Sequence, residues 1–173
     1  MRLDLGKIRT PHEHVEKVYA QEAFAGDRDV FRVVSSVTLA FEIFKDKAQF
    51  QLVGAAEGAL EQLCSRCLEA FVTPVDVHFD LRYQPHTANT GEGEREIEED
   101  DLTTAYYDND EIDLGQLMRE QFYLSLPMKP LCRDECRGLC PVCGTNRNRD
   151  ACACTPAWED PRLAVLKTLK QNG

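Results

Sequence analysis

Hydrophobic and polar residues alternate with a period of two through much of the first half of the chain, and this pattern predicts β-strands. The alternation runs over residues 30–44 and again over residues 48–63, where Gly54 or Gly58 would mark a bulge or break. A third alternating stretch covers residues 70–83. Short polar turns separate the three stretches. Together they predict an antiparallel meandering sheet, open or partly closed.

Helical signals flank the predicted sheet. Thr10-Pro11-His12-Glu13 has the pattern of a capping box with proline at the first helical position, and it predicts a helix that ends before Gly26. A second helix, with Asp113 as its N-cap, is expected to end before Pro127, and a third is expected to begin at Glu159. Strands and flanking helices together predict an α+β fold.

One segment carries most of the charge. The formal net charge is −10, and residues 92–113 alone hold eleven acids and one base. Residues 129–173 hold eight bases against five acids. Because residues 86–113 contain few apolar side chains, we expect them to form a mobile acidic insertion in an α+β domain of residues 1–128. Residues 129–173 are expected to form a cysteine-rich tail with the last helix packed on it.

Several classes of protein are disfavoured by the sequence. No apolar run reaches the roughly 20 residues that a membrane-spanning helix needs, and the first residues lack the apolar core of a secretory signal. We therefore expect a cytoplasmic protein, in which cysteines serve more often as metal ligands or redox groups than as disulfides. No nucleophile elbow, Walker loop or GxGxxG sequence is present, so nothing supports a catalytic function.

The cysteines carry the chemistry of this chain. They are Cys64, Cys67, Cys132, Cys136, Cys140, Cys143, Cys152 and Cys154. In Cys140-Pro141-Val142-Cys143-Gly144, two thiolates three residues apart can hold one metal ion, and Gly144 suits the positive φ that follows such a turn. Cys152 and Cys154 would complete a tetrahedral zinc site with this pair, in a C-terminal zinc knuckle.

The other four cysteines admit more than one arrangement. Cys64, Cys67, Cys132 and Cys136 would form a second zinc site between distant parts of the chain, or Cys132 and Cys136 would replace the last pair in a single site. A redox function for Cys64-Ser65-Arg66-Cys67 would require the motif to open a helix. The residues that follow alternate like a strand instead, which favours metal binding.

Five stretches of the sequence carry a family resemblance. They are Leu-Cys-Ser-Arg-Cys-Leu at 63–68, Leu-Pro-Met-Lys-Pro-Leu-Cys at 126–132, Cys-Arg-Gly-Leu-Cys-Pro-Val-Cys-Gly-Thr-Asn-Arg-Asn at 136–148, Cys-Ala-Cys at 152–154 and Asp-Pro-Arg-Leu at 160–163. In content and order they resemble the YceD family, the large ribosomal RNA subunit accumulation proteins, over about residues 31–169. The sequence departs from the family pattern at Arg147, where the family usually has leucine.

The resemblance implies a non-enzymatic ribosome-biogenesis factor that is needed for large-subunit ribosomal RNA to accumulate. We therefore predict that the protein binds pre-ribosomal RNA, a ribosomal protein or both. The expected RNA contacts are arginines on the cysteine loops, which suit phosphate and RNA shape: Arg133, Arg137, Arg147 and Arg149. If they do not contact RNA, these arginines are expected to favour solubility and to pair locally with Asp134, Glu135 and Asp150.

Two alternative functions belong to other classes. In the first, the protein is an adaptor or chaperone that captures a basic ribosomal protein through the acidic segment Glu92–Asp113. In the second, it is a thiol redox protein that acts through Cys64 and Cys67. No membrane or small-molecule substrate is expected in any of these functions.

Overall fold

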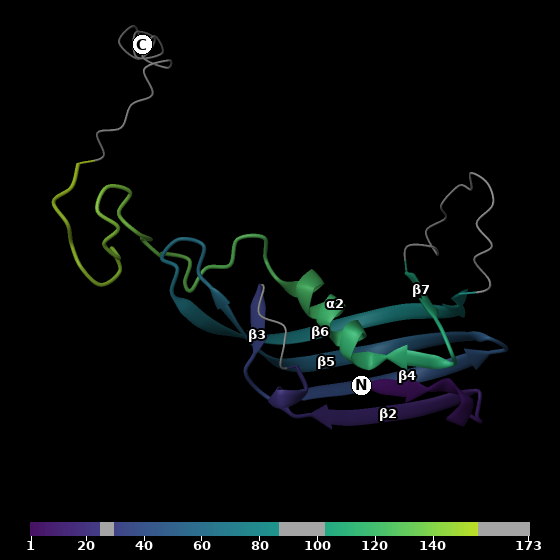
Figure 1. Cartoon of the computed structure of the whole chain (residues 1–173). Helices are drawn as coiled ribbons and strands as arrows, with labels where there is room; N and C mark the ends of the chain where they lie inside the picture. Colours follow the sequence, from purple (N-terminus) through teal and green to yellow (C-terminus); the bar gives the residue numbers. More distant parts are fainter. Residues whose placement is uncertain (25–29, 87–102, 156–173) are drawn as a thin grey trace, which may run out of the picture.

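The computed structural model describes residues 1–24, 30–86 and 103–155, and a six-stranded sheet is its main feature (Figure 1). The order across the sheet is β2-β4-β5-β6-β7, with β3 paired to β5. The bounds are β2 His12–Tyr19, β3 Phe31–Val33, β4 Val37–Asp46, β5 Gln49–Leu63, β6 Ala70–Pro85 and β7 Thr104–Tyr107. All neighbours are antiparallel except β6 and β7. The predicted meander is confirmed in β4, β5 and β6, and the sheet is open.

The region predicted as one strand over residues 30–44 contains two. Strand β3 ends at Val33, and β4 begins at Val37. Between them the Ser35 hydroxyl accepts a hydrogen bond from the backbone N–H of Ala59 at 2.8 Å, in place of a backbone carbonyl of the ladder. This side-chain hydrogen bond replaces one ladder bond where the chain passes from β3, paired with residues 60–62 of β5, to β4, paired with residues 49–57.

Strand β5 is continuous, so the predicted bulge or break near Gly54 or Gly58 is wrong. Its pairing with β4 and with β6 keeps one register throughout. Gly54 has a different function, because a Cβ atom there would lie 2.2 Å from the carbonyl oxygen of Ala40 on β4. The glycine therefore allows the backbones of the two neighbouring strands to approach closely.

The helix predicted to start at Thr10 is also wrong, because His12–Tyr19 is the edge strand β2. The expected local contact does form: the Glu13 carboxylate accepts hydrogen bonds from the Thr10 hydroxyl at 2.8 Å and the Thr10 N–H at 3.3 Å. The chain nevertheless continues extended. Its backbone pairs with β4 along eight residues, from His12 opposite Phe44 to Tyr19 opposite Val37. Pairing with an existing strand outweighs the local helical signal.

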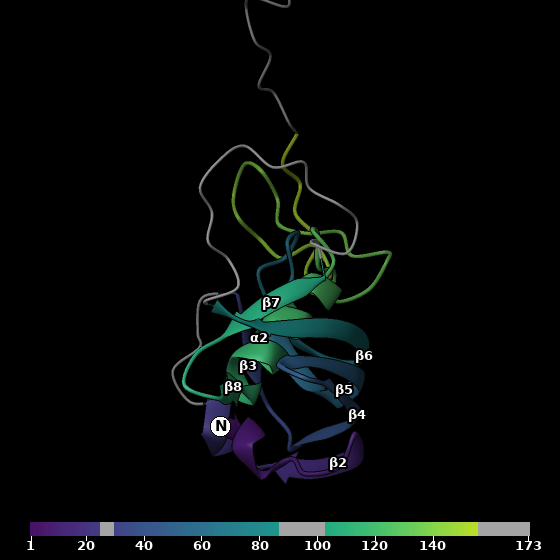
Figure 2. The same cartoon turned by 90° about the vertical axis from the view of Figure 1, so that its right-hand side faces the viewer.

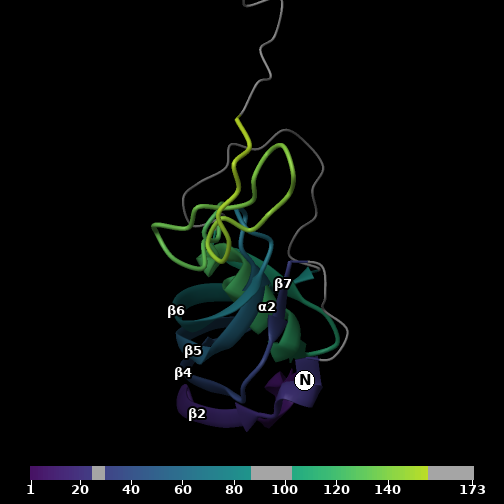
Figure 3. The same ribbon diagram turned by 90° about the vertical axis from the view of Figure 1, so that its left-hand side faces the viewer.

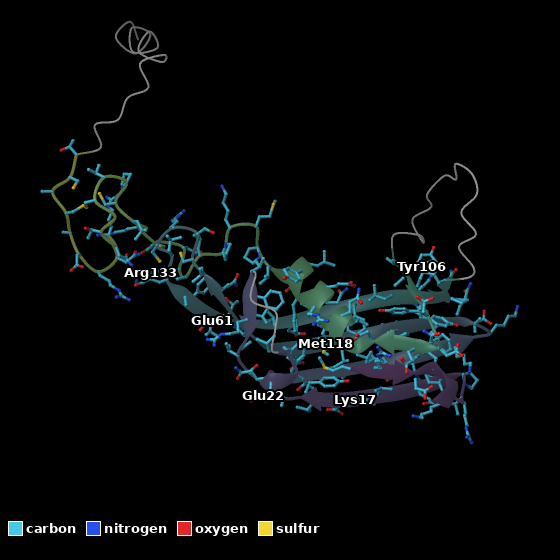
Figure 4. The ribbon with its side chains drawn as sticks, viewed as in Figure 1. Lys17, Glu22, Glu61, Tyr106, Met118 and Arg133 are labelled. Atoms are coloured by element: carbon cyan, nitrogen blue, oxygen red, sulfur yellow. The ribbon has the colours of Figure 1, made fainter. Side chains whose placement is uncertain are left out.

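One face of the sheet is covered by α2 (Leu114–Ser125) and by the chain's N-terminus (Figures 2 and 3). There β1 (Arg2–Asp4) pairs with β8 (Glu111–Asp113), and two short 3-10 helices lie at Leu5–Lys7 and Gln21–Phe24. The predicted N-cap is confirmed, since the Asp113 carboxylate accepts hydrogen bonds from the Gly115 and Gln116 N–H groups. Met118, labelled in Figure 4, and Phe122 are residues of α2 whose side chains are fully buried. Within the described ranges no helix is long and apolar enough to cross a membrane.

Part of the segment predicted as a mobile insertion forms strands. Strands β7 and β8 lie inside residues 86–113, so the prediction is wrong for the part from residue 104 onward. Tyr107 of β7 is buried against Phe50, and its hydroxyl donates to the Ala48 carbonyl at 2.9 Å. Residues 87–102 lie outside the described residues, and so does the last helix expected from Glu159. The division into residues 1–128 and 129–173 stays a prediction.

Candidate metal centre

The eight cysteine thiols gather into two sets of four. The first set is Cys64, Cys67, Cys132 and Cys136, and the second is Cys140, Cys143, Cys152 and Cys154. Within each set all sulfur atoms lie within 4.8 Å of one another, and all eight cysteines are free thiols. The structure therefore brings together the two groups favoured by the sequence. It does not place Cys132 and Cys136 in a single site with Cys140 and Cys143.

The sulfur positions fit a tetrahedral metal ion. The Sγ atoms of Cys64 and Cys136 are 3.8 Å apart, and those of Cys67 and Cys132 are also 3.8 Å apart. A tetrahedron with Zn–S bonds of about 2.3 Å has S–S edges of about 3.8 Å. A disulfide would need about 2.0 Å. The first set can therefore take up a zinc-sized ion with little movement of its thiols.

The two Cys-x-x-Cys segments have the same turn. The Leu68 N–H donates to the Cys64 carbonyl at 2.9 Å, and the Gly144 N–H donates to the Cys140 carbonyl at 2.9 Å. Leu68 has a φ of 60° and Gly144 a φ of 74°. The positive φ at Gly144 was expected, whereas Leu68 was missed because leucine rarely adopts this conformation. No helix follows Cys67, since β6 begins at Ala70, so the arrangement required for a redox motif is not formed.

The first set joins the end of the sheet to the segment after α2 (Figure 1). Cys64 and Cys67 lie in the connection between β5 and β6. The Ser65 N–H donates to the Pro130 carbonyl at 2.8 Å, and the Leu139 N–H donates to the Arg66 carbonyl at 3.0 Å. The Arg66 guanidinium donates to the carbonyls of Asp134 and Cys136. These bonds hold the two cysteine-bearing segments against each other.

Asn148 connects the two sets. It lies in the loop between Cys143 and Cys152 of the second set, yet its side-chain NH₂ donates to the Cys136 sulfur of the first at 3.2 Å. Its side-chain oxygen accepts the Arg137 N–H at 2.8 Å. Sequence reasoning missed this residue. The signal available was its place at the end of the Gly-Thr-Asn-Arg-Asn stretch.

Hydrogen bonds favour the thiolate form at selected sulfurs. Burial raises the pKa of Cys64, but hydrogen bonds from the backbone N–H groups of Cys132, Cys67 and Arg66 outweigh it and lower this pKa to about 6. Hydrogen bonds from the Thr145 side chain and backbone lower the pKa of Cys143 to about 6. Burial also raises the pKa of Cys136, but the Asn148 side chain contributes most to an overall lowering. Each set thus holds a readily ionised thiol.

Backbone hydrogen bonds from Cys143 and Val142 also lower the pKa of Cys140, whereas the pKa values of the other four thiols are raised. Burial and the neighbouring thiols raise the pKa of Cys132 to about 12, and Cys143 is the main cause that raises the pKa of Cys154 to about 12. Four negative charges within 4.8 Å repel one another, so the protein alone favours partial ionisation. A divalent cation would remove this repulsion, which is the chemistry expected of a cation site.

The four arginines proposed for RNA contact differ in their surroundings. Arg133, Arg137 and Arg147 are exposed, and Figure 4 shows Arg133 at the cysteine-rich end. Their side chains make no ion pair with Asp134, Glu135 or Asp150 in the part of the chain that the structure describes. Arg149 forms an ion pair with Glu69. The structure thus leaves three of the four guanidinium groups turned to solvent.

A family comparison identifies the chain's relatives. The model for the family described as "Large ribosomal RNA subunit accumulation protein YceD" matches residues 52–170, which include all eight cysteines. The chain belongs to the YceD family. This confirms the resemblance read from the cysteine motifs.

Individual relatives of this YceD-family chain are distant. It is 23% identical over 90% of its length to "Large ribosomal RNA subunit accumulation protein YCED homolog 1, chloroplastic" of Zea mays, and 23% identical over 79% to the protein of that name from Arabidopsis thaliana. The chain spans 61% and 49% of those relatives. It is 35% identical over 47% of its length to an uncharacterised protein of Mycobacterium tuberculosis, of which it spans 37%. No solved structure matches.

Proposed function

We propose that this protein supports the accumulation of large-subunit ribosomal RNA by binding pre-ribosomal RNA through a zinc-stabilised module, without catalysing a reaction. The observation that carries the proposal is the pair of cysteine sets, whose loops present Arg133, Arg137 and Arg147 to solvent. The family description and the names of the plant relatives support the cellular process. Those relatives are named as chloroplastic, so a cytoplasmic location stays a prediction for this chain.

The eight cysteines are the proposed zinc ligands, four to each ion. Bound zinc would neutralise part of the thiolate charge and join segments that are distant in sequence. Residues 132–154, which carry six of the eight cysteines, contain no α-helix or strand, so their loops depend on such links for a defined shape. We propose that the described residues 129–155 owe their order to these sites.

The exposed arginines would contact RNA. Each guanidinium presents five donors in a plane that suits phosphate oxygens, and it also stacks on bases in single-stranded RNA. Arg149 is less available, because it already pairs with Glu69. We therefore assign the main RNA contacts to Arg133, Arg137 and Arg147, and a minor one to Arg149.

The alternative of an adaptor acting through Glu92–Asp113 finds less support. In the described part of that segment, Glu111 pairs with Arg2, and Asp113 caps α2. These two acids therefore serve the fold rather than a partner. Residues 92–102 lie outside the described residues.

The test compares two triple variants in binding to fragments of large-subunit ribosomal RNA. Arg133→Gln, Arg137→Gln and Arg147→Gln together should weaken binding at least about tenfold and reduce its salt dependence, because fewer counterions are released. The matched control is Arg9→Gln, Lys17→Gln and Lys47→Gln, which removes the same charge from β2, from the segment before it and from the turn between β4 and β5. Equal affinities for the two variants would contradict the assigned contacts.

A second measurement tests the metal. Native mass spectrometry of the purified protein should show two zinc ions, and Cys143→Ser should leave one. A folded protein without metal would contradict the zinc proposal even if RNA binding were intact. Partner capture with and without RNase treatment then separates an RNA partner from a ribosomal protein.

A further inference from the structure

The sheet has a second face that no described segment covers. Figures 2 and 3 show α2 and the N-terminus on one side only. In β4 the side chains of Leu39, Phe41 and Ile43 are buried toward α2, while the residues between them point to the other side. This uncovered side is the open face, and the cross-strand register shows which residues share it.

A hollow crosses the centre of the open face. Strand pairing places Ala40 opposite Glu16 and Ala55, and Ala55 opposite His78. The next row contains His14, Glu42, Val53 and Asp80. The short alanine side chains leave a groove of about 600 Å³ with an apolar floor between the taller side chains of β2 and β6. We call this hollow the alanine groove.

Acidic side chains surround the alanine groove. Around and beside the groove the open face carries six carboxylates and two guanidinium groups: Glu16, Glu42, Glu57, Glu61, Asp76 and Asp80, with Arg32 and Arg82. Some of the carboxylates serve the fold. Glu42 is bonded to both His12 and His14, and Glu61 is bonded to Arg32. Glu16 and Glu57 are exposed without such a described partner.

We propose that the alanine groove is a docking surface for a basic polypeptide segment. Lysine or arginine side chains would lay their aliphatic parts on the apolar floor formed by Ala40 and Ala55, because burial of these parts is favourable. Their charged ends would reach Glu16, Glu57 and Asp76 at the edges. An acidic rim repels RNA phosphates, so charge complementarity selects a basic polypeptide rather than nucleic acid. The groove lies on the sheet, apart from the arginines of the cysteine loops, and the inference does not depend on the proposed RNA binding.

Histidine rings provide direct reporters of this binding. The chain has four histidines, and His12, His14 and His78 lie on the open face. His86 follows the end of β6, about 26 Å along the chain from His78 if the strand spacing is continued. A peptide of alternating lysine and alanine is the probe, and a peptide of alternating glutamate and alanine is its control. The lysine peptide should shift the ring resonances of His14 and His78 and leave those of His86 unchanged.

Variants separate the alanine groove from other acidic parts of the chain. Glu16→Gln, Glu57→Gln and Asp76→Asn together should weaken binding of the lysine peptide at least about tenfold. Glu22→Gln, Asp108→Asn and Asp110→Asn remove equal charge elsewhere and should have little effect. Ala55→Arg, which fills the floor with a cation, should abolish binding while the sheet stays folded.

Several results would overturn the proposal. Binding of the lysine peptide without shifts at His14 and His78 would show that another acidic segment captures it. The same shifts with the glutamate peptide, or with an RNA oligonucleotide, would assign a different partner. Shifts that depend on protein concentration alone would show that a second copy of the chain occupies the groove.

Discussion

The side-chain amide of Asn148 donates a hydrogen bond to the sulfur of Cys136 at 3.2 Å, and these two residues belong to different cysteine sets. The backbone of the same loop adds a second link, because the Arg147 N–H donates to the Gly138 carbonyl at 2.9 Å. The loop of the second set therefore places a hydrogen-bond donor against a thiol of the first set. We expect the two proposed metal sites to influence each other.

Removing this donor should weaken the first site. In Asn148→Ala, Cys136 loses the hydrogen bond that contributes most to lowering its pKa, so its thiolate becomes less favourable. Loss of such an outer contact typically costs about 10- to 100-fold in metal affinity. A chelator competition that follows the release of each of the two metal ions should show weaker binding at the first set.

The variant Asn148→Asp serves as the matched control for the direction of the hydrogen bond. It keeps an oxygen that can accept the Arg137 N–H but replaces the donor facing Cys136 with another acceptor. Metal affinity at the first set should fall at least as far as in Asn148→Ala. Retention of full affinity by the aspartate variant would show that the donor is unimportant.

Two glycines of the cysteine segment should respond differently to substitution by alanine. Both have positive φ, but a Cβ at Gly138 would lie 2.8 Å from the Arg66 carbonyl oxygen, whereas a Cβ at Gly144 meets nothing within 4 Å. Gly144→Ala should therefore lower the free energy of unfolding by only about 1 kcal/mol, because alanine must adopt the left-handed conformation there. Gly138→Ala should cost more than about 2 kcal/mol, because it also forces apart the two segments of the first set. Thermal unfolding of the zinc-loaded protein compares them, and equal losses would refute the close contact.

Metal binding should release protons. The pKa values of Cys67 and Cys132 in the first set, and of Cys152 and Cys154 in the second, are raised, so these thiols hold protons at pH 7 in the metal-free protein. Zinc requires thiolates, so binding should release at least two protons from each set and tighten as pH rises. Below about pH 6 Cys64 and Cys143 also gain protons, and the dependence should steepen. Calorimetry in buffers of different ionisation enthalpy counts the protons, and pH-independent affinity would contradict thiolate ligation.

Strand β5 offers another matched pair of glycines. Gly54→Ala would place a Cβ 2.2 Å from the Ala40 carbonyl oxygen and 2.4 Å from the Phe41 Cβ, so the strands must separate. We expect a loss of about 3 kcal/mol or more in the free energy of unfolding. In Gly58→Ala the nearest atom to the new Cβ is a side-chain methyl of Val37 at 3.3 Å, so stability should change by less than about 1 kcal/mol. Chemical denaturation measures both, and a harmless Gly54→Ala would show that the sheet can relax there.

The predictable parts of the fold were those with a strong periodic pattern. Strands β4 to β6 follow from alternation, and α2 follows from its Asp113 cap and apolar face. Strand β2 was mistaken for a helix because Thr10 and Glu13 make the local contact typical of a helix start. What overrides this signal is the long-range pairing with β4, which is not visible in a local window.

The sequence alone predicted four pairs of candidate metal ligands among the eight thiols, since their spacing allows two sulfurs to approach one ion within each short segment. It also determined the family, because the motifs around these thiols are specific. The meeting of Cys64 and Cys67 with Cys132 and Cys136 depends on the folded arrangement, because β5 and β6 carry one pair to the end of the sheet and the chain leaving α2 brings the other pair to the same place. The link from Asn148 to Cys136 and the uncovered alanine groove likewise depend on which strands and loops become neighbours, and local spacing carries no information about those contacts.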